Sequence, residues 1–121
     1  MKALLIVMAV GELLTGVALC IAPSVAISFL LNTSIGEDGG ILVGRIAGIA
    51  LVTLGLACWL SRNVAGTSLV MVRAMIIYNL GVAGFFIYGN LAEHISGIGL
   101  WPVVFLHIVL GIWCITNLVR K

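Results

Sequence analysis

Four polar side chains stand inside long apolar stretches of this chain, where such groups are rare. They are Glu12, Arg45, Asn79 and His107. A charge at the centre of a bilayer costs about 2.5–3.5 kcal/mol on insertion scales, so we expect Glu12 to be neutral, paired with a cation or in contact with water. A carboxyl beside an imidazole could carry protons, and a buried arginine could bind an anionic group.

The composition places these groups in a membrane. The chain has 121 residues, of which 63% are hydrophobic and 8% are charged, and its mean hydropathy is +1.32. Water-soluble domains are about 45–50% apolar and about 25% charged, so an ordinary soluble fold is excluded. The chain has no charge run, no basic tract and only three cysteines, which also excludes disorder, nucleic-acid binding and a disulfide scaffold.

The charged residues divide the chain into four apolar stretches, each of about the 20 residues that one crossing needs. We predict one transmembrane domain over residues 1–121, an all-α antiparallel four-helix bundle. Its helices are expected at about residues 3–22, 40–60, 69–88 and 101–119. Residues 24–31 are too few to cross, so we predict a short helix at the interface. Glu12 in the middle of the first stretch is untypical of a cleaved signal peptide, so that helix is expected to be retained.

The basic residues predict the orientation. Four of the six lie at helix ends that would share one side of the bundle: Lys2, Arg62, Arg120 and Lys121. The connections on the other side carry no lysine or arginine. Since cytoplasmic segments are enriched in basic residues, both termini are predicted to be cytoplasmic.

The depth of the polar groups suggests a site. At 1.5 Å per residue, Glu12 and Asn79 lie near the midplane, and Arg45 and His107 lie closer to the outer boundary. Each long helix can thus point one polar group inward. We therefore predict a ligand-binding pocket formed by Glu12, Arg45, Asn79 and His107. The alternative is a buried hydrogen-bonded group that only fixes the register of the helices.

Glycines mark the helix contacts. Gly40, Gly44 and Gly48 repeat every four residues, and Gly55 follows seven residues later. Such a strip lets helix backbones approach closely in lipid. Packing within the bundle is the preferred interpretation, with a seam between copies of the chain as the alternative. Three further glycines could serve in the same way on the last two helices: Gly81, Gly84 and Gly111.

Other chemistry is not indicated. The cysteines form no C-x-x-C pair, and the two histidines are 13 residues apart, so we predict neither a thiol redox centre nor a metal site. We predict no cofactor and assign no catalytic residue. An enzyme is thus the less favoured class.

Two families share features with the chain. Val10-Gly11-Glu12-Leu13-Leu14-Thr15 resembles the first helix of small multidrug resistance transporters, which carries an essential glutamate. Two arginines inside the predicted helices, Arg45 and Arg73, would repel the cations that those proteins export. The chain as a whole resembles the DoxX-like group of small four-helix bacterial membrane proteins, through Arg45-x-x-Gly48 with Gly55 and through Trp101-Pro102. That resemblance implies a multi-pass protein of the bacterial inner membrane.

The leading functional hypothesis is therefore an accessory membrane subunit, or a protein that binds a small amphiphile or an anionic headgroup in the polar pocket. The expected partners are the lipid bilayer, such a ligand, and a membrane protein or a second copy of the chain. One alternative is a proton-coupled transporter with Glu12 as the carrier and His107 as a relay. A membrane enzyme acting on a lipid or quinone is the third hypothesis.

Overall fold

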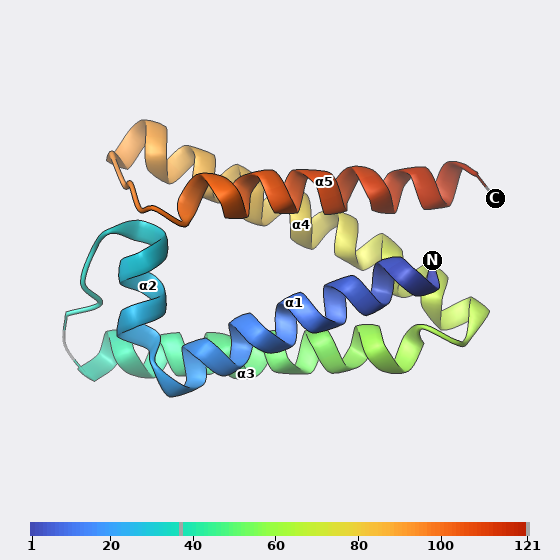
Figure 1. The fold of residues 1–121 in the computed structure, drawn as a ribbon, viewed down its shortest axis with the longest axis horizontal. Coiled ribbons are helices and arrows are strands. Elements are labelled where there is room, and N and C mark those ends of the chain that lie inside the picture. Colours follow the sequence, from blue (N-terminus) through green and yellow to red (C-terminus); the bar gives the residue numbers. More distant parts are fainter. Residues whose placement is uncertain (37, 121) are drawn as a thin grey trace.

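The computed structural model describes residues 1–36 and 38–120 and consists of helices joined by short connections (Figure 1). The helices are α1 (Lys2–Ile21), α2 (Pro23–Leu31), α3 (Asp38–Ser61), α4 (Ala65–Glu93) and α5 (Leu100–Val119). All except α2 are long and apolar enough to cross a membrane. The all-α class and the four apolar helices predicted from the sequence are thus confirmed.

A proline separates α1 from α2. Ala22, the residue before Pro23, has φ −136° and ψ 63°, outside the helical region. Because a proline disfavours the helical conformation of the residue before it, α1 ends there. Pro23 itself suits the first position of the next helix. The short helix α2 then ends at Asn32, which adopts a left-handed conformation with φ 51°.

The long helices associate in two pairs. Helix α1 packs mainly against α3, and α4 packs mainly against α5. In Figure 1 both termini and the turn between α3 and α4 lie at one end of the molecule. The opposite end holds α2 and the connection from α4 to α5, where the Gly99 N–H donates to the carbonyl of Phe29 at 3.1 Å. Helix α2 therefore joins the two pairs at that end.

Glycines hold α1 and α3 in close contact. A Cβ added to Gly48 would lie 2.7 Å from the carbonyl oxygen of Gly16 and 2.7 Å from the Cys20 sulfur. A Cβ on Gly55 would lie 2.8 Å from the side chain of Leu13. No larger residue fits without moving a backbone. The glycine strip predicted from the sequence thus packs within the chain.

The glycines of the later helices behave differently from one another. Gly111 of α5 faces α4, since an added Cβ would lie 3.0 Å from Leu80 Cδ2. Gly81 and Gly84 have nothing within 4 Å of an added Cβ. The expectation that these two glycines pack against a neighbouring helix was therefore wrong for this chain, because they lie on a face of α4 turned away from its partners.

Helix α4 is longer than expected, since it covers residues 65–93 instead of 69–88. Polar contacts extend it at both ends. The Ser68 hydroxyl donates to the carbonyl of Ser61 near its start, and Asn90 Nδ2 donates to the carbonyl of Ile95 at 2.8 Å near its end. His94 then ends the helix in a left-handed conformation with φ 57°. Hydropathy marks the apolar part of the helix and not these polar turns.

One apolar cluster, termed the core cluster below, lies where the helix pairs meet. Its members are buried and come from all four long helices: Leu4, Leu5, Met8, Ala9, Cys58, Val72, Met75, Leu110 and Cys114. Many large apolar side chains remain outside it, such as Ile77 at 78% exposed and Phe85 at 80%. Such an outer surface suits lipid and not water.

Candidate functional site

A hydrogen bond joins the two helix pairs through a buried carboxyl. Glu12 of α1 is only 6% exposed, and its Oε2 accepts the hydroxyl hydrogen of Tyr78 of α4 at 2.8 Å. Tyr78 is partly buried and packs against the core cluster. Because a bare carboxyl in an apolar interior is costly, this hydroxyl supplies part of the hydration that Glu12 loses.

A second hydrogen bond joins α4 to α5. Asn79 is fully buried, and its Oδ1 lies 2.9 Å from His107 Nδ1. The amide orientation is fixed because Asn79 Nδ2 donates to the carbonyl of Met75 at 2.7 Å. Since Oδ1 can only accept, His107 Nδ1 must carry the hydrogen. The neutral imidazole then presents Nε2 as an acceptor.

The two hydrogen bonds are part of one group. The rings of Tyr78 and His107 meet edge to face, with centroids 5.7 Å apart and planes at 76°. We call Glu12, Tyr78, Asn79 and His107 the polar cluster. It takes side chains from α1, α4 and α5, which are distant in sequence. The structure thus brings together three of the four residues proposed from the sequence.

Arg45 lies outside the polar cluster. It is exposed on α3, whereas its neighbours Gly44 and Gly48 are buried. Successive residues of a helix are about 100° apart, so the face of α3 that contacts α1 does not include Arg45. The backbone carbonyl of Arg45 accepts a weak hydrogen bond from the Cys20 thiol at 3.7 Å. The guanidinium is thus oriented toward the surroundings of the protein.

Tyr78 was missed in the sequence analysis. Tyrosine and tryptophan in membrane proteins usually lie at the interfaces, where the polar tip reaches water. Tyr78 instead follows thirteen helical residues of α4 and precedes fifteen more. Since a buried tyrosine hydroxyl usually finds a hydrogen-bond partner, a tyrosine in the middle of a span, next to Asn79, was the available signal.

Two acceptor atoms of the polar cluster stay available. Within residues 1–36 and 38–120 the hydrogen bonds of the cluster use Glu12 Oε2 and His107 Nδ1, and none uses Glu12 Oε1 or His107 Nε2. In the same residues no fully buried side-chain nitrogen or oxygen lacks a partner. These two atoms therefore keep some accessible surface. A ligand that donates hydrogen bonds could reach them.

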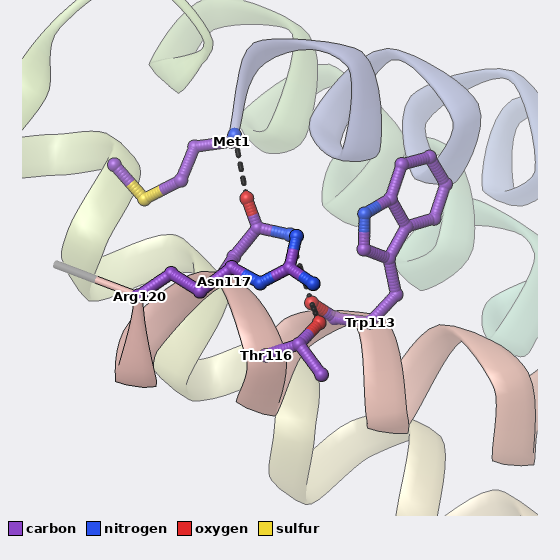
Figure 2. Close-up of a pocket in the computed structure, with 5 residues that line it drawn as sticks. All are labelled: Met1, Trp113, Thr116, Asn117 and Arg120. Carbon is purple, nitrogen blue, oxygen red and sulfur yellow. Dashed lines mark hydrogen bonds between the residues drawn. The ribbon is translucent and has the colours of Figure 1, made fainter.

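A pocket of about 360 Å³ lies at the end where the termini meet, lined by Met1, Trp113, Thr116, Asn117 and Arg120. Figure 2 shows the Met1 amino group donating to Asn117 Oδ1, over 2.8 Å. Asn117 Nδ2 in turn donates to the carbonyl of Trp113 at 2.9 Å. These contacts tie the start of α1 to the end of α5. The pocket includes no member of the polar cluster.

The described part of the chain holds no group of three or more histidine, cysteine, aspartate or glutamate side chains that could bind a metal ion. Comparison with known proteins gives no family model that matches, no similar curated protein and no similar solved structure. The functional argument therefore depends on the geometry of the polar cluster.

Proposed function

We propose that this protein is a small multi-pass membrane protein that binds an amphiphile through Glu12 and His107, which Tyr78 and Asn79 hold in place by hydrogen bonds. The observation that carries the proposal is the pair of available acceptors, Glu12 Oε1 and His107 Nε2, in an otherwise satisfied buried cluster. Ionisable groups inside a membrane are costly, and they commonly serve a function there.

The available atoms favour a ligand that donates hydrogen bonds. An amino headgroup could give one hydrogen to the carboxyl and another to the imidazole, and a single hydroxyl could donate to one of the two. The anionic ligand inferred from the sequence depended on Arg45 in the pocket, and Arg45 is exposed on α3. The proposed ligand is therefore an amphiphile with a neutral or cationic donor group, whose apolar part contacts the lipid-facing helices.

We further propose that the four long helices form an antiparallel bundle with both termini in the cytoplasm. We propose a bacterial inner membrane, as the resemblance to the DoxX-like group implies. The positions of Lys2, Arg62 and Arg120 support this orientation. They belong to the two termini and the α3–α4 turn, which lie at the same end in Figure 1. Basic residues favour the cytoplasmic side.

Native mass spectrometry of protein extracted with its surrounding lipid tests ligand binding. A bound small molecule should be present on the native chain, absent from Glu12→Gln and weakened in His107→Phe. Thr53→Val is a matched control, since Thr53 is exposed and donates only to its own helix at Ile49. Arg45→Ala separates two ligand classes, because a donor ligand stays bound and an anionic one is lost. A bare native chain would refute the binding function.

A second function is favoured by the continuity of the cluster. The Tyr78 hydroxyl donates to the Glu12 carboxyl, and the Tyr78 and His107 rings meet edge to face. Two groups that can exchange protons thus lie on either side of Tyr78, as a proton-coupled transporter would need. Solute flux in liposomes would then follow a proton gradient and disappear in Glu12→Gln and Tyr78→Phe. Flux that persists in both variants would rule out this path.

A further inference from the structure

The sulfur atoms of this chain are concentrated in one place. The chain has four methionines and three cysteines. Met8, Cys58, Met75 and Cys114 are members of the core cluster, and Met1 and Met71 pack against it. Only Cys20 lies elsewhere. None of the strongly exposed apolar residues is a methionine or cysteine.

The four buried sulfur residues converge from four helices. Met8 belongs to α1, Cys58 to α3, Met75 to α4 and Cys114 to α5, and each is at most 1% exposed. Both cysteines are free thiols. Thiols and thioethers are thus the donors that this part of the bundle offers.

We propose that Cys58 and Cys114, with the thioethers of Met8 and Met75, form an intramembrane binding site for Cu(I). Soft sulfur ligands select this ion over Mg²⁺, Ca²⁺ or Mn²⁺, which prefer oxygen. The set contains neither the third thiolate nor the histidine that structural zinc sites use.

Charge also favours a monovalent ion. When Cu(I) binds, one of the two cysteines loses its S–H proton to water as the Cu–S bond forms, and the other keeps its hydrogen and binds through a neutral sulfur, so the site is neutral. The thioethers are neutral donors. A divalent ion would be neutral only if both cysteines lost their protons, and with one thiolate it would leave a net positive charge in the apolar interior, which is costly. No electron is transferred in this step, because the copper is supplied as Cu(I).

The partly buried methionines suggest how the ion arrives. Met1 packs against the core cluster and also lines the pocket at the end where the termini meet (Figure 2). Met1 therefore contacts both this pocket and the core cluster. Met71 packs against the same cluster from α4. A soft ion could pass from the pocket to the cysteines along sulfur atoms.

The test is a competition titration of the full chain in nanodiscs, without oxygen, using Cu(I) held by a chromogenic chelator. We expect the native chain and Cys20→Ser to take one Cu(I) from the chelator, and X-ray absorption to show sulfur neighbours. Cys58→Ala and Cys114→Ala should each lose the ion. Cys20 is the matched control, since it is the one cysteine outside the core cluster.

Two further variants keep the test informative if the cysteine variants misfold. Met8→Leu and Met75→Leu nearly conserve volume, so the fold should tolerate them. Each removes one proposed sulfur ligand and is expected to weaken Cu(I) binding by at least about 10-fold, the loss that outer groups of metal sites already cause. Equal copper uptake by the native chain and the Cys58→Ala/Cys114→Ala variant would overturn the proposal. So would a native chain that takes no copper, or bound copper without sulfur neighbours.

Discussion

Tyr78 of α4 donates its hydroxyl hydrogen to Glu12 of α1 at 2.8 Å, across the boundary between the two helix pairs. Most other close packing occurs within a pair, α1 with α3 and α4 with α5. The hydrogen bond therefore acts at a thin interface, where the core cluster supplies most of the remaining contact. Loss of this bond should therefore change how the two helix pairs sit relative to each other. It should change the structure within each pair much less.

Tyr78→Phe removes this hydrogen bond while the ring stays. Because hydrogen bonds between membrane helices average about 0.6 kcal/mol and reach about 1.7 kcal/mol, we expect a stability loss in this range. Denaturation of the purified protein, followed by circular dichroism, measures it. Combining Tyr78→Phe with Glu12→Gln should add little further loss. Tyr88→Phe is the matched control, since Tyr88 is 59% exposed, and an equal loss there would contradict the prediction.

Gly48→Ala should disrupt the contact between α1 and α3. The new Cβ would lie 2.7 Å from the backbone oxygen of Gly16, which cannot move without displacing α1. Overpacking of this kind costs roughly 1–3 kcal/mol. Gly81→Ala tests the same change at a position with nothing within 4 Å, and it should be neutral or slightly stabilising. The measurement compares the melting temperatures of the two variants. Equal changes in melting temperature would mean that α1 and α3 do not pack at Gly48.

Asn79→Ala should release the imidazole of His107. In the native chain the hydrogen is on Nδ1, because Asn79 Oδ1 accepts it at 2.9 Å. Nitrogen NMR of histidine-labelled protein should show one tautomer for His107 in the native chain and a mixture in Asn79→Ala. Asn90→Ala, which removes only the contact to Ile95 in the α4–α5 connection, should leave His107 unchanged. A native His107 that already exchanges between tautomers would refute the geometry.

The orientation can be tested with reporter fusions. Alkaline phosphatase is active only outside the cytoplasm, so a fusion after Arg120 should be inactive and one after Glu93 should be active. The basic residues predict this outcome. A green fluorescent protein fusion should give the opposite result, with fluorescence after Arg120 and none after Glu93. Reversed activities at the two positions would place the termini outside and would invert the proposed topology.

The apolar stretches were sufficient to predict the helices but not their polar ends. The predicted ranges for the first and last helices are within one residue of α1 and α5 at each end. Helix α4 was underestimated by four or five residues at each end. Its additional turns are held by Ser68 and Asn90, which donate to the carbonyls of Ser61 and Ile95 in the adjoining connections. Hydropathy carries no information about such contacts.

The candidate site was predicted in part. Burial of Glu12 and Asn79 follows from the cost of exposing a polar group to lipid, which is visible in the sequence. The direction of Arg45 is not visible, because α3 is apolar around most of its circumference and only the glycines show which side faces α1. Tyr78 was missed because an interfacial role is the usual one for tyrosine. Whether the cluster binds a ligand stays a prediction.

The pairing of α1 with α3 has a consequence for synthesis of the chain in the cell. Both partners precede α4, and their close glycine contact uses only residues before Arg62. This pair can therefore assemble while the ribosome is still adding the second half. Until Tyr78 leaves the insertion machinery, Glu12 has no partner from α4 in the lipid. The Glu12 carboxyl must therefore be kept away from lipid during synthesis. We expect the first pair of helices to enter the bilayer only together with the second pair.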